Sequence, residues 1–338
     1  MKKKSLYFLL FTLGILFAIN ACTKRPETVK PSDDSFNNYF AGQRNKVQTF
    51  TLNAETGDVI TGDKGTKVYI GAGTLRTMSG QQVKGTVTIE LKEITQFSDM
   101  VLNTSPTISK GKLLKSGGEF HISAKQNGTP LTLAQNASYF INIEAPHGTS
   151  DSMKVFTGAD SSGVIIWTPV ETDTVNNNIQ LPDTAANKIQ YDTAVFLNSN
   201  NTSWGIVNSA YAYMVKCNSF GWINADYFIE MQYANLCEQT VICDPSLNLD
   251  DQQTRVYYLL PASNSCAMLY HNQDGFVFTG GVPNNQHIKI VAFSNKDGKS
   301  YVCVMDHYVN STDSKIVVLN FIEVQESQVE SYLSQINI

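Results

Sequence analysis

Cysteine is the residue type in this sequence with the widest choice of chemistry, because a thiol can carry lipid, form a disulfide, ligate a metal or act as a nucleophile. The six cysteines lie at positions 22, 217, 237, 243, 266 and 303. Cys237 and Cys243 are the closest pair and the candidates for a disulfide. The alternative is that the five later thiols are buried as small apolar side chains. A zinc site would need a Cys-x-x-Cys or a matched His pair, and the sequence contains neither.

Histidine is the usual general base, and the five histidines lie at positions 121, 147, 271, 287 and 307. Asp306 and His307 could complete a triad with Cys266 or Cys303, but adjacent residues on a strand point to opposite faces. The sequence also lacks a Gly-x-Ser-x-Gly elbow, a phosphate-binding loop and a His-Glu-x-x-His helix. We therefore expect no enzymatic activity, no metal and no cofactor.

The N-terminal sequence has the features of an export signal. Lys2 to Lys4 precede a weakly polar to apolar run from Leu6 to Ile19, which suits a signal peptide and is shorter than the roughly 20 apolar residues that cross a bilayer. The run leads into Ile19-Asn20-Ala21-Cys22, which resembles the lipobox of bacterial lipoproteins. By that resemblance, residues 1–21 are a lipoprotein signal peptide and Cys22 receives the lipid. A generic secretory signal that happens to end near a cysteine is the alternative.

The same resemblance implies a location and a membrane partner. Thr23, rather than Asp, follows Cys22, and lipoprotein sorting then points to the outer membrane, on either its periplasmic or its outer face. Residues 22–36 contain two Pro and mixed charges and are expected to form a tether. The 317 residues after position 21 carry 22 Lys and Arg against 30 Asp and Glu, a net charge of −8. This acidic balance excludes nucleic acid as an expected partner.

The remainder of the chain is patterned as short strands. Charged residues make up 16% and aromatic residues 10% of the sequence, which favours packed β-structure over disorder. Val87, Ile89 and Leu91 alternate with polar residues, as in a half-buried antiparallel strand. The expected strands are 48–52, 66–70, 85–94, 119–125, 138–144, 153–157, 164–170, 210–216, 227–233, 254–260, 275–279, 287–294, 300–309 and 315–323. Gly298 in the loop 295–299 is suited to a hairpin turn.

Two of these segments carry a family resemblance. Residues 65–75 (GTKVYIGAGTL) and 83–91 (VKGTVTIEL) resemble the ZU-five domain, a β-sandwich module. They are more similar still to uncharacterised lipoproteins of Gram-negative bacteria, which residues 98–100, 114–118 and 220–226 also resemble. Gly71 and Thr74 stand where that pattern has Pro and Ala. The resemblance implies a β-sandwich that serves as an interaction scaffold, and it implies no chemistry.

The expected architecture is all-β, with two β-sandwich domains joined by a polar connection. Residues 37–170 form the ZU-five-like domain, the polar and almost aromatic-free segment 171–194 forms the linker, and 195–338 form the second domain. A short C-terminal helix ends the chain. Ser327 and Glu330 have the spacing of a capping box, and Val329, Tyr332, Leu333 and Ile336 form one apolar stripe.

Two short motifs predict covalent chemistry. His121-Ile122-Ser123 resembles the His-Phe-Ser at which some ZU-five domains cleave themselves, which would place cleavage between Ile122 and Ser123, although the tripeptide lies within a regular strand pattern. Asp followed by Ser or Thr and an aliphatic residue resembles an O-glycosylation site of Gram-negative bacteria. The sites of that form are Ser152, Thr174, Thr184 and Thr193. An ordinary polar loop rich in Asp and Thr is the alternative.

The function that these patterns favour is a lipid-anchored envelope protein that acts as a non-catalytic binding or scaffold module for an envelope protein or a glycan. A surface glycan binder is the first alternative, because aromatic platforms among amides suit sugars. Trp204, Tyr211 and Tyr213 would have to be exposed together to form such a platform. A self-cleaving ZU-five-like domain is the second alternative.

Overall fold

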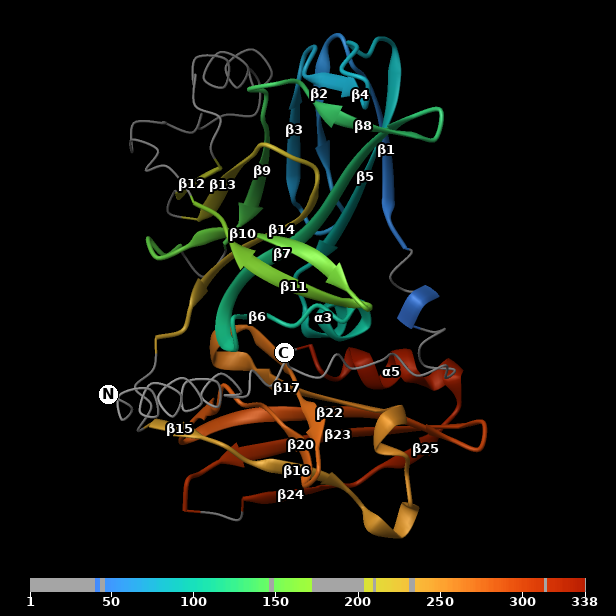
Figure 1. Cartoon of the computed structure of the whole chain (residues 1–338), viewed down its shortest axis with the longest axis vertical. Coiled ribbons are helices and arrows are strands. Elements are labelled where there is room, and N and C mark those ends of the chain that lie inside the picture. Colours follow the sequence, from blue (N-terminus) through green and yellow to red (C-terminus); the bar gives the residue numbers. More distant parts are fainter. Residues whose placement is uncertain are drawn as a thin grey trace, which may run out of the picture. The chain divides into compact units, whose positions relative to one another are not determined.

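The computed structural model describes residues 40–42, 46–145, 149–171, 204–208, 211–230, 235–312 and 315–337. It is built mostly of strands arranged in several sheets (Figure 1), so the all-β expectation is confirmed. Among these residues, no helix has both the length and the apolar character needed to span a bilayer.

Two sheets pack together in the N-terminal half. The larger contains β1 (Gln48–Asn53), β4 (Leu75–Thr77), β5 (Thr86–Ile94), β6 (Ile108–Ser109), β7 (Lys112–Gln126), β8 (Thr129–Leu133), β10 (Lys154–Ser161), β11 (Val164–Pro169) and β14 (Gly221–Phe228). Its main path runs β1-β5-β7-β14-β10-β11. The smaller contains β2 (Gly57–Thr61), β3 (Lys67–Gly71), β9 (Tyr139–Glu144), β12 (Gly205–Asn208) and β13 (Ala212–Cys217), in the order β12-β13-β9-β3-β2. One hydrophobic core takes buried residues from both sheets, including the alternating Val87, Ile89 and Leu91 of β5.

A second pair of sheets follows in the C-terminal half. One contains β16 (Thr240–Cys243), β19 (Tyr270–Asn272), β20 (Gly275–Val277) and β24 (Ile316–Leu319), in the order β19-β20-β16-β24. The other contains β17 (Thr254–Leu260), β18 (Ser265–Met268), β22 (Gln286–Lys296), β23 (Lys299–Val309) and β25 (Ile322–Val324), in the order β18-β17-β22-β23-β25. A short pair joins β15 (Leu236–Cys237) to β21 (Val282–Pro283). Buried residues of both larger sheets again form one core.

The sheet of β17, β22 and β23 is buried on both faces. Val256 and Tyr258 belong to the core shared with the β16 sheet, whereas Tyr257 and Leu259 face a third core. That third core also includes residues of α3 (Phe97–Asn103) and α5 (Val329–Ser334). Burial on both sides explains why the 254–260 segment is apolar without alternation. It also explains why the described residues from Phe40 onward cluster as one compact unit.

The sheets divide at a different place from the expected domain boundary. β12 and β13 join β9, and β14 inserts between β7 and β10, although all three strands follow the polar segment at 171–194. Residues 172–200 lie outside the described part of the chain. A polar segment marks a long connection, and it carries no information about which strands pair on either side of it.

Local structure departs from expectation at several places, and strands such as β2, β8, β16 and β18 were not predicted at all. The expected strand 227–233 ends at Phe228, and 315–323 is two strands, β24 and β25. The helix α3 was not anticipated because its seven residues are too few to establish a helical period. The expected capping box of α5 is not formed, since Gln328 occupies the cap and makes no side-chain capping bond. The apolar stripe of that helix is confirmed, with Val329, Leu333 and Ile336 buried.

Candidate functional site

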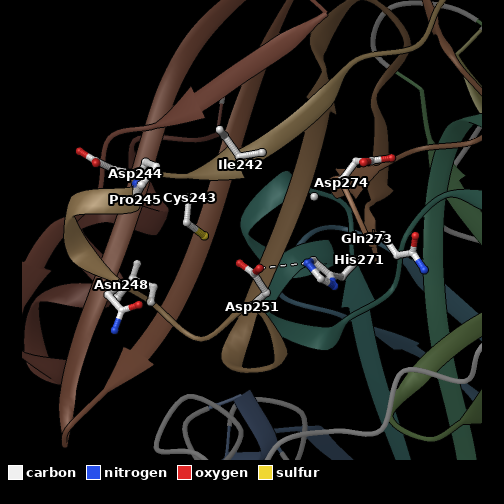
Figure 2. Close-up of a pocket in the computed structure, with 11 residues that line it drawn as sticks. Ile242, Cys243, Asp244, Pro245, Asn248, Asp251, His271, Gln273 and Asp274 are labelled. Carbon is white, nitrogen blue, oxygen red and sulfur yellow. Dashed lines mark hydrogen bonds and ion pairs between the residues drawn. The ribbon is translucent and has the colours of Figure 1, made fainter.

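A pocket of about 350 Å³ lies on the C-terminal half, between the end of β16 and the β19–β20 hairpin (Figure 2). The 3-10 turns η3 (Pro245–Leu247) and η4 (Asp251–Gln253) also contribute to its wall. The lining residues are Ile242, Cys243, Asp244, Pro245, Asn248, Leu249, Asp251, His271, Gln273, Asp274 and Gly275.

The loops around the pocket are fixed by side chains that bind nearby backbone. The Asp244 carboxylate accepts a hydrogen bond from the Ser246 amide at 2.8 Å and so caps η3. The Asn272 side chain accepts from the amides of Asp274 and Gly275 at 2.8 and 3.1 Å, which closes the hairpin turn. Gly275 has a φ of 137°, and a Cβ there would lie 2.6 Å from the Val241 carbonyl oxygen. The hairpin can approach β16 this closely only because that position is glycine.

His271 and Asp251 form the central interaction of the pocket. The His271 Nε2 lies 3.0 Å from a carboxylate oxygen of Asp251. The dashed line between the two side chains in Figure 2 marks this contact. The imidazole also packs against the ring of Phe276, with 5.0 Å between the ring centroids. A carboxylate on one side and an aromatic ring on the other fix the orientation of the histidine.

The Cys243 thiol lies in the same pocket but is not activated. Burial and the neighbouring carboxylate of Asp251 raise the pKa of Cys243 to about 12. A nucleophilic cysteine needs a lowered pKa, which a nearby cation or an imidazole would provide. Here His271 bonds to Asp251, so the arrangement lacks the Cys–His contact of a thiol enzyme.

The pocket is acidic. Three of its lining residues are Asp, and its lining includes no Lys or Arg. The Ser246 backbone amide lowers the pKa of Asp244, so that group is ionised at neutral pH. Within the described ranges, no three His, Cys, Asp or Glu side chains are placed to hold a metal ion. The arrangement can therefore accept hydrogen bonds from a bound molecule, and it repels anions.

The residues predicted for self-cleavage lie on β7, between β5 and β14. The Ser123 hydroxyl donates to the Glu90 carboxylate at 2.8 Å, and the His121 ring packs on Trp222 with centroids 4.8 Å apart. Burial and the nearby Lys92 charge lower the pKa of His121. Backbone pairing continues through this part of the strand, so the strained turn that the chemistry requires is not formed here.

The cysteines of the described chain are buried or partly buried thiols. Cys237 and Cys243, the candidates for a disulfide, are both present as thiols. Burial raises the pKa of Cys217 and Cys266 and that of Cys303 to about 11. These properties are those of small apolar core residues, which was the alternative reading of the cysteines.

The remaining sequence candidates are spread over the molecule. Asp306 binds Lys289 at 2.7 Å and His307 contacts Gln239 at 2.9 Å. The two adjacent residues therefore bond to different side chains and not to each other. Of the proposed aromatic platform, Tyr211 is 70% exposed, Tyr213 is buried and Trp204 packs against the core, so the three do not form one exposed surface.

Ser152 is exposed in a turn, which suits a modification site. The other predicted modification sites lie outside the described part of the chain; they are Cys22, Thr174, Thr184 and Thr193.

Sequence reasoning missed the partnership of Asp251 with His271. The two lie 20 positions apart, and they meet because β20 pairs with β16. The signals that could have found them are the Asp-Pro-Ser turn at 244–246 and the Asn-Gln-Asp-Gly turn at 272–275, both of which bring loops to the end of β16.

Comparison with protein-family models gives no match to this chain, and comparison with curated proteins gives none either. The class that the fold defines is an all-β protein with sandwich packing. The resemblances to lipoproteins and to the ZU-five domain stay predictions.

Proposed function

We propose that this protein is an outer-membrane lipoprotein whose β-sandwich region is a non-catalytic binding module. Its ligand is a small molecule that carries hydroxyl or amino groups and has no net negative charge. One observation carries the proposal: the pocket presents three carboxylates and two side-chain amides, and its lining includes no Lys or Arg. Carboxylate and amide oxygens accept hydrogen bonds, so they suit ligands rich in donors.

The absence of an activated nucleophile in the pocket supports binding rather than catalysis. The Cys243 thiol stays protonated beside Asp251, and the His271 ring is engaged by that same carboxylate. A glycan is one source of the required hydroxyl groups. The pocket supports that alternative better than the aromatic residues do, because Tyr213 is buried and Trp204 packs against the core.

The lipid anchor rests on the lipobox-like sequence that ends at Cys22. Each buried acyl methylene contributes about 0.8 kcal/mol, so several chains on one cysteine hold a protein on a membrane stably. The test is the mass of the N-terminal fragment of the protein produced in a Gram-negative host. The fragment should begin at Cys22 and carry acyl mass, whereas Cys22→Ala should carry none and Cys243→Ala should be lipidated normally. A wild-type fragment that lacks acyl mass would contradict the anchor and favour a generic secretory signal.

Calorimetric titration with three related sugars tests the ligand class. Glucosamine supplies an ammonium group and hydroxyls, glucose supplies hydroxyls alone, and glucuronate adds a negative charge. We expect glucosamine to bind most tightly, glucose more weakly and glucuronate not at all. Asp274→Asn should weaken glucosamine binding, whereas the matched change Asp63→Asn, at an exposed position of the other sandwich, should leave it unchanged. Glucuronate binding as strong as that of glucosamine, or unchanged binding in Asp274→Asn, would contradict the proposal.

A further inference from the structure

Two carboxyl groups that do not line the pocket are buried inside the molecule. Glu119 on β7 and Asp226 on β14 both have no exposed surface. Their strands are paired, with Asn224 opposite Glu119 and Ser116 opposite Asp226. An oxygen of each carboxyl, Glu119 Oε1 and Asp226 Oδ1, has no hydrogen-bond partner, and neither has the amide oxygen of Asn224. Buried oxygens without partners are rare and need an explanation.

An irregularity in the sheet creates this arrangement. Between Ser116 and Glu119, β7 has one residue more than the facing stretch of β14, and the register shifts there. The extra length is taken up by Gly117 and Gly118, of which Gly118 has a φ of 136°. Bulges of this kind redirect side chains, and they are found where a side chain has a special task.

The groups that face the pair offer it no compensating positive charge. The Ser105 hydroxyl donates to Glu119, and the Asn224 amide donates to Asp226 at 2.6 Å. The Ser116 hydroxyl and the Gly117 amide also interact with Asp226 and oppose the rise of its pKa. The titratable neighbours are Asp99 on α3 and Cys266 on β18, both of which interact with Glu119.

Two cations on neighbouring strands, Lys92 on β5 and Arg255 on β17, have hydrogen-bond partners of their own. Lys92 donates to Asn103 at 2.8 Å, and Arg255 donates to Thr104 at 3.4 Å. Burial and the mutual repulsion of the two acids raise the pKa of Glu119, and burial raises the pKa of Asp226 to about 8.

Both carboxyls lie next to the contact between the N-terminal half and β18. We call this contact the seam; it joins residues 105–116 to residues 263–268. On the Glu119 side, the chain continues from Ser105 to Thr107, which donates its amide to the Cys266 carbonyl at 2.8 Å and accepts from the Cys266 amide at 2.7 Å. On the Asp226 side, Ser116 accepts at its carbonyl from the Asn264 amide at 3.1 Å.

The Ser265 hydroxyl adds a further bond across this seam, to the Leu114 carbonyl at 2.6 Å. A charge on either acid would therefore disturb residues that hold the halves together.

We propose that Glu119 and Asp226 form a proton-loaded latch: while the pair holds its protons the seam with β18 stays closed, and loss of those protons opens it. Protonation turns an orphan acceptor into a donor, and the amide oxygen of Asn224, opposite Glu119, is the acceptor that it can reach. Ionisation leaves two neighbouring negative charges in a site with no exposed surface, and the structure relieves that cost by separating at the seam. The latch is independent of the function proposed for the pocket.

Hydrogen exchange of the full-length chain at pH 6 and pH 8.5, corrected for the intrinsic rate, tests the latch. Amides of 105–116 and 263–268 should exchange at least about ten-fold faster at the higher pH, while those of β9 keep their protection. Glu119→Gln and Asp226→Asn keep the shape and cannot ionise, so the double variant should lose this pH dependence. Equal protection of the seam at both pH values, or the same loss in the double variant, would overturn the proposal.

A second measurement needs no variant and so does not depend on variants that fold. The infrared spectrum of the native protein at pH 7 should contain the carbonyl band of protonated carboxylic acid, and the band should weaken as the pH rises through about 8, where Asp226 loses its proton. Absence of the band at pH 7 would overturn the latch. Restoration of seam protection at pH 8.5 by Ca²⁺ would also overturn it, because the pair would then be a cation site.

Discussion

The molecule holds carboxyl groups in two contrasting environments. In the pocket, the side chains of Asp251 and His271 are 42% and 29% exposed, and they form a hydrogen-bonded pair in contact with solvent. At the seam, Glu119 and Asp226 have no exposed surface and share their site with an amide and hydroxyl groups. Exposure to water decides which form of the acid is stable, because a charge loses its hydration when it is buried.

The contrast teaches that acidic residues in one chain can have opposite roles. A solvated carboxylate keeps its charge and can exchange one partner for another, which a binding site requires. A buried carboxyl keeps its proton. If that proton is removed, the free-energy cost weakens the contacts around the carboxyl. The pocket and the buried pair are both acidic, but their carboxyl groups differ in charge state.

The largest expected effect is the pH dependence of the free energy of unfolding, which separates the buried acids from the solvated ones. Raised pKa values mean that the folded state binds more protons than the unfolded state, so stability falls as the pH rises. The fall begins above the ordinary carboxyl range and continues through about pH 8 for Asp226, and it is on the order of several kcal/mol. Denaturant unfolding between pH 5 and pH 8.5 measures it. Glu90 and Asp244, whose pKa values are lowered, have already made their contribution above pH 5. Stability that rises or stays level across this range would contradict the sealed state of the pair.

The next largest effect is expected from a substitution in the β7 bulge, which positions Glu119 and Asp226. Gly118→Ala forces an L-residue to a φ of 136° and puts its Cβ 2.9 Å from the Phe120 ring, so it should lower the free energy of unfolding by about 3 kcal/mol. Gly128→Ala is the matched control, because that glycine has a φ of 78° and open space around it. It should cost only about 1 kcal/mol. Equal costs at the two positions would show that the bulge has no special role.

A smaller effect is expected when the hydrogen-bonded pair of the pocket, Asp251 and His271, is removed. Asp251→Asn should change the free energy of unfolding by less than about 1 kcal/mol, because the pair is partly exposed and screened. Glucosamine binding should weaken about ten-fold, which corresponds to about 1.4 kcal/mol. A large loss of stability with unchanged binding would reverse the roles that we assign to the two sites.

The smallest effect concerns the reactivity of Cys243. Its raised pKa makes alkylation at pH 8 slow, and burial is the main cause. Removing the negative charge in Asp251→Asn should therefore speed alkylation of Cys243 only several-fold, as followed by peptide mass spectrometry. Alkylation of the wild-type thiol as fast as that of an unfolded cysteine would contradict the environment described for the pocket.

The sequence predicted what depends on local pattern. Strict alternation located β5, and the polar loop at 295–299 became a two-residue turn with positive φ at Asp297 and Gly298. The apolar stripe of α5 was also readable, since helical spacing of apolar residues reflects the surface on which a helix packs.

Long-range pairing could not be predicted in this way. Asp251 meets His271 through the pairing of β16 with β20, and Glu119 meets Asp226 because β14 returns to β7 from beyond the polar segment. A single sequence records no partner for a strand, so an acid within it looks like part of a solvated face. The burial of Glu119 follows from that pairing and from the bulge at Gly117 and Gly118.

A glucosamine titration followed by NMR on isotope-labelled protein tests the central claim most directly, namely that ligand binds in the open pocket and not at the sealed pair. The account predicts that the signals of His271, Gln273 and Asp274 shift with increasing glucosamine, while those of Glu119 and Asp226 do not. Shifts confined to the seam, or to Tyr211 and its neighbours, or no shift at any concentration, would contradict it.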